Sequence, residues 1–437
     1  MAHELPTWIT DDPSDGFTRE PDPALTHPDL VVALSHEPEN NLIKARVYGG
    51  AVPASMDEYV TTLEARPATV AAVAASLRER WIKELVEFEP VDPDGVPAPG
   101  RAELPYATRL DLSAEPEEEL YEILEELVAQ GSHLLFDVLL GGEAKRTRRL
   151  RRVLLDALRQ DGPLRVRFNS DIPLPWPMLC LPEDRGRTLP TAAREAVAGL
   201  FGRFVGYRHQ TEQTGPYTWI FDEADEKPRP TPEVPCVSLN HDPGIDPDGR
   251  TRAAEVAALL ADGTAFVERV SRREFLDALR AGSLDEQLMY FWCHGAFATG
   301  PDNSRHLVVR LGDGKDIDAR TILARHDPSQ TTPLLQRRPL VLLNACYAGL
   351  ADSGDIAQLG GALLRTGAAG VLGPQIRIPQ IFAAEYAHAF VTRYLDGRRT
   401  AGEITHTLAR EFADHHRNPL GLAYALHYGM DNRLRRS

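Results

Sequence analysis

Short apolar runs alternate with amphipathic segments throughout the second half of the chain. Residues 236–239, 288–293 and 340–343 are almost continuously apolar, and amphipathic stretches such as residues 252–260 separate them. Strands that are buried on both faces of a parallel sheet have this continuous apolar pattern, and the helices that connect them supply the amphipathic segments. We therefore predict an α/β fold in which helices flank a mostly parallel sheet.

Hydroxyl and acidic side chains mark where two helices of this half begin. Ser271 and Glu274 have the spacing of a capping box, and Thr400 and Glu403 repeat it. In a capping box, each of the two side chains accepts a hydrogen bond from a backbone N–H group of the first helical turn. We expect helices to begin at both positions.

The first half of the chain mixes strands and helices. Residues 30–34 and 42–48 predict two strands around a turn. Apolar residues recur at helical spacing within residues 56–88, 115–139 and 145–158, and we expect helices there.

Two proline-rich stretches interrupt these patterns. Residues 89–105 are rich in Pro, Asp and Gly, and residues 222–235 contain the run Pro-Arg-Pro-Thr-Pro. Neither composition suits a helix or a central strand. The expected organisation is a disordered arm at 1–28, a small α+β region at 29–105, a first sheet half at 106–222, a Pro-rich linker at 223–235 and a second sheet half at 236–431.

The charge balance of the chain is acidic. Its 48 Lys and Arg residues face 64 Asp and Glu residues, which gives a formal net charge of −16 at pH 7. Such a balance argues against a protein that coats nucleic acid, and no nucleic-acid partner is expected. The basic run at residues 145–152 could contact a nucleic acid, a nucleotide or an acidic partner, but a solvated helix face is the favoured interpretation.

Membrane insertion, disulfides and zinc are not expected either. No uncharged apolar run reaches the ~18 residues that span a bilayer, and residues 1–28 do not resemble a signal peptide, so we predict a cytoplasmic protein. The four cysteines, Cys180, Cys236, Cys293 and Cys346, show no C-x-x-C spacing. Each is interpreted as a buried thiol or a nucleophile, and no metal site is predicted.

Two of the apolar runs end on reactive side chains. Residues 288–293 lead into His294 and Gly295, and residues 340–343 lead into Asn344-Ala345-Cys346. Functional groups of parallel sheets lie just beyond the carboxyl ends of the strands. We therefore expect an imidazole and a thiol at one edge of the sheet.

These residue types meet the needs of a cysteine peptidase. Such an enzyme uses a thiol nucleophile, an imidazole that transfers protons, and backbone N–H groups that stabilise the oxyanion. Cys346 is the expected nucleophile and His294 the general base or acid, while the N–H groups of Gly295 and Cys346 are the expected oxyanion hole. The histidine precedes the cysteine by 52 positions (346 − 294), close to the ~50 residues found in caspases.

These two motifs resemble those of the CHAT family, which belongs with caspases and separases in one superfamily of cysteine peptidases. Residues 171–179 resemble the family's Leu-Pro-Trp-Glu-Leu-Leu segment, with Pro177 in place of the usual Glu. Residues 360–370 resemble the helix and strand that follow the nucleophile, and residues 423–429 resemble the terminal strand. The resemblance covers residues 115–431.

The resemblance implies both a fold and an activity. It implies a caspase-like fold, with an inactive caspase-like half at 106–222 and a catalytic half at 236–431. It implies peptide hydrolysis by His294 and Cys346 without a metal or an organic cofactor. It also implies that a partner or ligand activates the protein, within a bacterial defence or cell-death pathway.

Three acidic residues near the predicted site are candidates for substrate binding. Asp242 follows the strand at 236–239, and Asp352 and Asp355 follow Cys346. They could line a pocket for an Arg or Lys side chain before the scissile bond, but they are equally ordinary turn residues.

The leading hypothesis is a cysteine endopeptidase that cleaves a protein substrate through a Cys-His dyad and a thioester intermediate. A catalytically silent caspase-like module that binds a partner protein in the same cleft is the alternative, and other acyl-transfer chemistry is a third. The presence of both His294 and Cys346 favours the first, because a scaffold needs neither. Activation is expected from another protein, from a ligand acting on residues 29–105, or from self-cleavage within residues 222–235.

Overall fold

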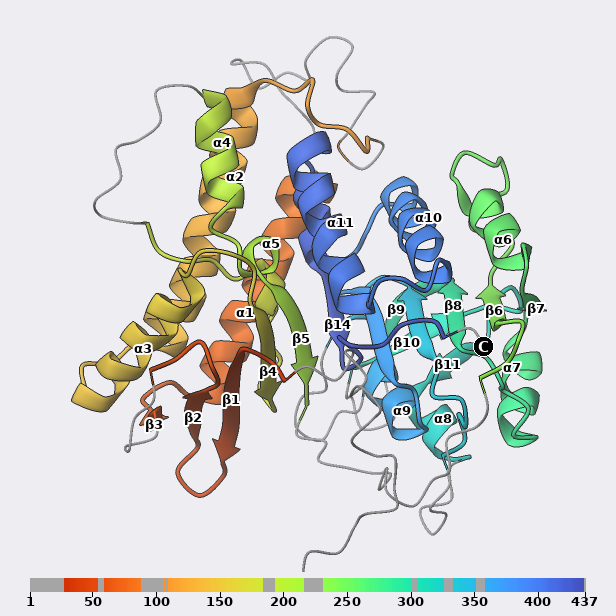
Figure 1. The fold of residues 1–437 in the computed structure, drawn as a ribbon, viewed down its shortest axis with the longest axis horizontal. Helices are drawn as coiled ribbons and strands as arrows, with labels where there is room; N and C mark the ends of the chain where they lie inside the picture. The colour runs from red at the N-terminus through yellow and green to blue at the C-terminus, as the bar shows by residue number, and fades with distance from the viewer. Residues whose placement is uncertain are drawn as a thin grey trace, which may run out of the picture.

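The computed structural model shows an α/β protein built on one large sheet (Figure 1). The structure describes residues 27–53, 59–87, 106, 109–183, 193–215, 231–299, 305–325, 333–350 and 358–435. Most of the predicted arm at 1–28 and part of the predicted linker at 223–235 lie outside these residues.

The large sheet has 11 strands, and most neighbouring strands run parallel. Seven of its ten adjacent pairs are parallel and three are antiparallel, which confirms the predicted sheet. From one edge to the other, the strands are β3 (Tyr59–Leu63), β2 (Leu42–Tyr48), β1 (Leu30–Glu37), β4 (Arg165–Ser170), β5 (Gln210–Thr214), β14 (Tyr424–His427), β13 (Gly370–Pro374), β12 (Leu340–Asn344), β8 (Leu288–Trp292), β6 (Cys236–His241) and β7 (Ala265–Arg269).

Helices cover the sheet and create two hydrophobic cores. Tyr290 and Trp292 of β8 face the first core, whereas Met289 and Phe291 face the second, because successive side chains of a strand point to opposite faces. The first core lies under α1 (Pro67–Trp81), α2 (Glu117–Ser132), α3 (Lys145–Leu158), α6 (Ala253–Ala261), α10 (Gln380–Leu395) and α11 (Ala401–His416). The second core lies under α7 (Arg272–Arg280), α8 (Ala319–Leu323) and α9 (Leu359–Arg365).

A second, small antiparallel sheet was not predicted. It consists of β9 (His294–Thr299), β10 (Arg305–Arg310) and β11 (Asp316–Asp318), and it packs on the second core through Leu307 and Val309. Its first strand begins at His294, directly after β8 and Cys293. The polypeptide therefore leaves the large sheet at the predicted histidine.

Both predicted capping boxes are confirmed. The Ser271 hydroxyl accepts the Glu274 N–H at 3.2 Å, and the Glu274 carboxylate accepts the Ser271 N–H at 3.0 Å. Thr400 and Glu403 make the same two bonds at 3.3 and 2.8 Å. Local side-chain chemistry therefore sets where α7 and α11 begin.

The helix predicted within residues 56–88 is confirmed from Pro67 onward, but the prediction that it begins near residue 56 is wrong. Within that range the structure has strand β3, then α1, and then the π-helical turn η2 (Ile82–Val86). The Tyr-Val-Thr-Thr-Leu sequence of β3 is rich in β-branched residues and pairs with β2. Pro67, at the first position of α1, marks the true start of the helix.

Strands from three of the predicted regions lie in the same sheet. β1 pairs in parallel with β4, with Val32 opposite Phe168, and β5 pairs with β14. The five-part division of the chain stays a prediction. Among the described residues, no helix has the length and apolar character needed to cross a bilayer.

The basic run lies on α3 as predicted. Leu154 and Leu158 are buried, while Lys145, Arg146 and Arg152 are exposed. This distribution is that of an amphipathic helix with a solvated basic face.

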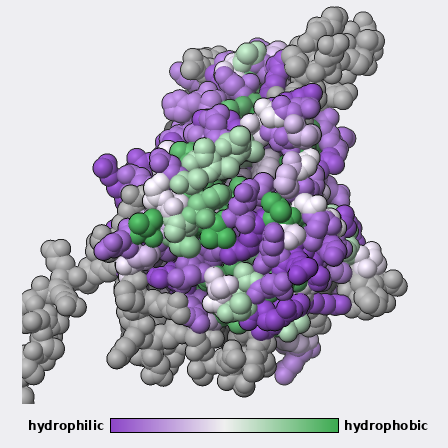
Figure 2. Space-filling view, turned by 90° about the vertical axis from the view of Figure 1, so that its right-hand side faces the viewer, coloured by the Kyte–Doolittle hydropathy of each residue, from purple (hydrophilic) through white to green (hydrophobic). Residues whose placement is uncertain are grey.

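The edge of the sheet at β7 is visible in Figure 2 as a mixed surface with scattered hydrophobic patches. Small side chains contribute to the apolar part, since α6 exposes Ala254, Ala258 and Ala261. Val270, just after β7, is one of the larger exposed apolar residues. This face therefore carries little bulky apolar surface.

A buried ion pair joins the end of β7 to the start of β8. Arg269 Nη2 lies 2.6 Å from Glu286 Oε1, and both side chains are buried. We expect Glu286→Gln to lower the free energy of unfolding by about 3–5 kcal/mol, because it leaves the Arg269 charge buried and uncompensated. Urea denaturation of the full chain measures this change.

The exposed pair between Asp277 and Arg280, at 3.0 Å, supplies the control. Asp277→Asn should change the free energy of unfolding by less than about 1 kcal/mol. Equal effects of the two substitutions would contradict the importance of the buried pair.

Candidate active site

The register between β8 and β12 brings the two predicted catalytic residues together. The strands are parallel neighbours, and Asn344 lies opposite Trp292. His294 and Cys346 each follow that pair by two residues, so the 52-residue spacing in the sequence is the register of the sheet (344 − 292 = 346 − 294). Both residues line one open pocket of about 50 Å³.

The turn that carries Cys346 is held by the segment after β13. The Tyr347 N–H donates to the Ile376 carbonyl at 3.2 Å, and the Gly349 N–H donates to the Pro374 carbonyl at 2.8 Å. Tyr347 has a φ of 64°, a left-handed conformation that is costly for a bulky side chain. The surrounding hydrogen bonds therefore keep the residue after Cys346 in a strained conformation.

Asn344 fixes the end of β12 from inside the protein. Its side chain is buried, with 3% exposed. Its Nδ2 donates to the Ala383 carbonyl at 2.8 Å, and its Oδ1 accepts from the Tyr424 hydroxyl at 2.8 Å. These bonds tie the strand that leads to Cys346 to both α10 and β14.

A buried histidine holds the other end of the same turn. His427 Nε2 donates to the Gly349 carbonyl at 2.8 Å. Burial lowers the pKa of His427, so the neutral ring with a proton on Nε2 makes this bond. His427 therefore acts as a structural donor, in keeping with its interpretation as a packing residue.

Gly295 packs directly against the backbone of Cys346. A Cβ atom at Gly295 would overlap the Cys346 carbonyl oxygen and would lie 2.9 Å from the Cys346 nitrogen. No other residue fits there without moving one of the two segments. The two backbone N–H groups proposed for the oxyanion hole therefore belong to segments in direct contact.

The environment of Cys346 favours the protonated thiol. Burial raises its pKa above the ordinary cysteine value, whereas the Ile378 N–H and the nearby Arg377 charge act in the opposite direction. The net shift is upward, so a base must remove the proton before the sulfur becomes a strong nucleophile.

Arg377 connects this site to the N-terminal part of the chain. Its guanidinium forms an ion pair with Glu87, which follows η2. Both side chains are about half exposed, and such a pair contributes little to stability. The pair matters for the site because the Arg377 charge is close enough to Cys346 to act on the pKa of its thiol.

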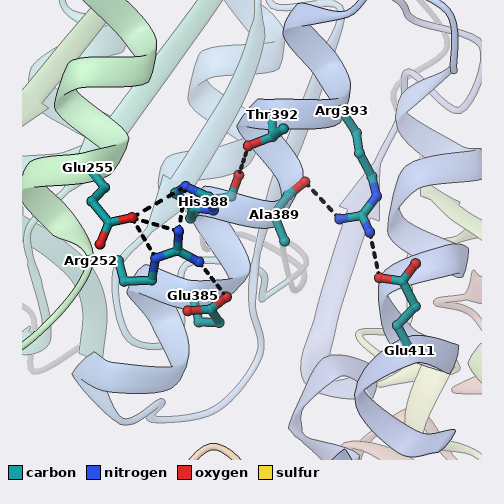
Figure 3. Close-up of polar contacts among 8 residues, drawn as sticks. All are labelled: Arg252, Glu255, Glu385, His388, Ala389, Thr392, Arg393 and Glu411. Atoms are coloured by element: carbon teal, nitrogen blue, oxygen red, sulfur yellow. Dashed lines mark hydrogen bonds and ion pairs between the residues drawn. The ribbon is translucent and has the colours of Figure 1, made fainter. Parts of the chain in front are cut away.

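Ion pairs also hold α10 (Figure 3). The first turn of this helix lines the pocket. Arg252, just before α6, lies 2.9 Å from Glu385 and donates to His388 Nε2 at 2.9 Å. On the other side, Arg393 lies 2.6 Å from Glu411 of α11. Burial and the Arg252 charge lower the pKa of His388, so its neutral ring can accept this bond.

The three acidic residues predicted for substrate binding have different outcomes. Asp242 lies in the turn after β6, where its Oδ1 accepts the Gly244 N–H at 2.9 Å, and it is not among the residues that line the pocket. Asp352 and Asp355 lie outside the described residues.

The other cysteines are less suited to nucleophilic attack. Cys293 and Cys180 are buried, and burial raises the pKa of both thiols. Burial and the neighbouring acidic residues raise the pKa of Cys236 to about 11. Within the ranges that the structure describes, no three His, Cys, Asp or Glu side chains gather in a way that could hold a metal ion.

Apolar pocket residues were missed by the sequence reasoning. Ile245 comes from the turn after β6, Ile378 from the segment after β13, and Ala383 from α10. The first two lie in irregular segments, where no hydrophobic period marks a functional position.

A model of the CHAT domain matches residues 144–419. The chain belongs to the CHAT family. The resemblance carried by the His294-Gly295 and Asn344-Ala345-Cys346 motifs is thereby confirmed.

The chain spans less than a third of the length of each protein that it matches below. A protein named as a probable protease, from Vitiosangium sp., is 30% identical over 183 residues, which are 41% of this chain and 23% of that protein. Two crystal structures of the Saccharomyces cerevisiae separase–securin complex are similar at 10% and 9% identity, with TM-scores of 0.44 and 0.40. Each match covers 91% of this chain and 30% of the other.

The raised pKa of Cys346 predicts how alkylation depends on pH. Iodoacetamide should modify Cys346 slowly at neutral pH and faster as pH rises, with a midpoint above that of an unperturbed cysteine, because the thiolate is the reactive form. Arg377→Gln should move the midpoint further upward, since it removes a charge that lowers the pKa. Mass spectrometry of the Cys346 peptide measures the rate.

Arg398→Gln is the matched control, because Arg398 is exposed and pairs with Asp396. It should leave the midpoint unchanged. A downward shift in Arg377→Gln would contradict the assigned effect of this charge.

The close packing at Gly295 predicts a cost for any side chain. Gly295→Ala should lower the free energy of unfolding by about 1–3 kcal/mol, because its methyl group must displace the Cys346 backbone. Gly199→Ala in α4 (Ala193–Phe201) is the control, since a Cβ there meets nothing within 4 Å. Urea denaturation of both variants tests this, and equal stability of the two would refute the contact.

Proposed function

We propose that this CHAT protein is a cysteine endopeptidase with Cys346 as nucleophile and His294 as general base and acid. The observation that carries the proposal is the β8–β12 register, by which both residues reach one pocket from neighbouring strands. A thiol, an imidazole and two backbone N–H groups are the components of acyl transfer by a cysteine peptidase.

The proposed reaction starts from a protonated thiol. His294 removes the Cys346 proton as the sulfur attacks the carbonyl carbon of the scissile peptide, and the carbonyl oxygen becomes an oxyanion. The N–H groups of Gly295 and Cys346 stabilise that oxyanion. His294 then protonates the leaving amine, the C–N bond breaks and a thioester forms, which a water molecule hydrolyses with His294 again as the base.

The proposed catalytic half is residues 236–431, and residues 106–222 are the proposed inactive half. All residues described around the pocket come from the first of these ranges, between Ile245 and Ala383. The name of the Vitiosangium relative, a probable protease, agrees with a peptidase.

Activation by a partner protein or ligand is part of the proposal, within a bacterial defence or cell-death pathway. The ion pair between Glu87 and Arg377 supports a role for residues 29–105, because it connects that region to the surroundings of Cys346. The alternative is a silent module that binds a partner protein in the same pocket.

Covalent labelling by peptidyl acyloxymethyl ketones distinguishes these possibilities. We expect the full chain to gain the mass of one label, Cys346→Ala to gain none, and His294→Ala to react at least about 100-fold more slowly. Intact-mass spectrometry measures the label, and thermal unfolding shows that the variants are folded. A folded wild-type chain that no ketone labels would favour either the silent binding module or a peptidase that lacks its activator, and repeating the labelling with candidate activators present separates the two.

A further inference from the structure

The walls of the pocket next to Cys346 are mostly apolar, although Gln380, exposed at the first position of α10, adds an uncharged amide. Trp292 lies at the end of β8, Ile245 in the turn after β6, Ile378 after β13 and Ala383 in α10. These four residues come from four separate segments, yet none offers a polar side chain except for the indole N–H of Trp292. The pocket therefore suits an apolar group that is removed from water.

Charged groups are scarce around this space. Among the described residues that line it, the ionisable side chains are His294 and the thiols of Cys293 and Cys346. The Asn344 amide is already occupied, because it bonds to the Ala383 carbonyl and the Tyr424 hydroxyl. A charged side chain placed here would lose its water. No described lining residue offers it a fixed opposite charge, because Arg377 and Asp242, which act on Cys346 and Cys293, lie outside the lining.

Asp242 does not change this conclusion. Its carboxylate accepts the Gly244 N–H within its own turn, and the residue does not line the pocket. Of the three acidic candidates, Asp242 therefore does not supply a partner for an Arg or Lys side chain bound next to Cys346, and Asp352 and Asp355 lie outside the described residues.

The size of the pocket limits what can enter. The pocket is compact, with a volume of about 50 Å³, and it is open on one side, so it suits a small or medium-sized side chain. Leucine and isoleucine side chains have four carbon atoms and valine has three. A phenylalanine side chain has seven carbon atoms and fits this compact space less well.

We infer that the pocket formed by Ile245, Trp292, Ile378 and Ala383 binds an aliphatic P1 side chain of three or four carbon atoms, the residue whose carbonyl Cys346 attacks. This inference rests on the proposed peptidase function and adds the substrate class. It selects protein substrates that are cleaved after Leu, Ile or Val.

A series of peptidyl acyloxymethyl ketones that differ only at P1 tests this inference on the full chain. With Leu, Ala, Phe, Arg or Asp at P1, the rate of Cys346 labelling is measured by intact mass. We expect the Leu ketone to label at least about tenfold faster than the Arg, Asp and Phe ketones.

Two variants change the pocket in opposite directions. Ala383→Leu fills it and should reduce the advantage of the Leu ketone over the Ala ketone at least about tenfold. Ile245→Ala enlarges it and should increase the rate of the Phe ketone relative to the Leu ketone. The second variant tests the inference even where the larger side chain at position 383 prevents folding.

Asp242→Asn is the control and should leave the ratio of the Leu rate to the Arg rate unchanged. Fastest labelling by the Arg ketone, or loss of Arg labelling in Asp242→Asn, would overturn the inference while the peptidase function stands. Failure of all five ketones, with candidate activators present, on folded protein whose Cys346 reacts with iodoacetamide would instead overturn the peptidase function, and this inference with it.

Discussion

The parallel pairing of β8 with β12 is the constraint on which the site depends. In a sheet, shifting the register of one strand against its neighbour by one residue moves every side chain of that strand to the opposite face. Both strands lie between the two cores, and their successive side chains point alternately into one core and the other. A one-residue slip would therefore place large side chains in the wrong core. Packing far from the site therefore fixes His294 and Cys346 at the same level of the sheet.

Polar contacts then restrict the turn that follows β12. The Asn344 side chain joins α10 and β14 to the strand end, and His427 holds the Gly349 carbonyl. Buried hydrogen bonds of this kind favour one arrangement, because breaking any of them leaves an unsatisfied polar group. The strained backbone of Tyr347 persists within this frame, and Gly295 lets the neighbouring segment approach it closely.

The sequence was sufficient to predict the features that depend on residues close together in the chain. Continuous apolar runs located β8 and β12, hydroxyl–carboxylate pairs located the starts of α7 and α11, and the two strand ends located the candidate dyad. Strand β3 was missed although its β-branched sequence favours a strand, because the helical spacing of the residues that follow Pro67 was extended back over it.

The pocket was missed for a related reason. Ile245 and Ile378 lie in irregular segments that meet only in the folded protein. Asp242 has a side chain that could bind Arg or Lys, but its carboxylate accepts the Gly244 N–H within a turn. A residue's type therefore indicated possible chemistry, whereas the fold determined which groups face the nucleophile.

The contact between Glu87 and Arg377 shows how a weak interaction can still matter to such a site. Both side chains are about half exposed, so the pair adds little to stability. The two residues are 290 positions apart, so no local sequence pattern predicts the contact. Arg377 nevertheless acts on the Cys346 thiol, because its charge favours the thiolate. Because Glu87 pairs with Arg377, the N-terminal region contacts the side chain whose charge acts on the nucleophile, although Glu87 is not among the residues that line the pocket.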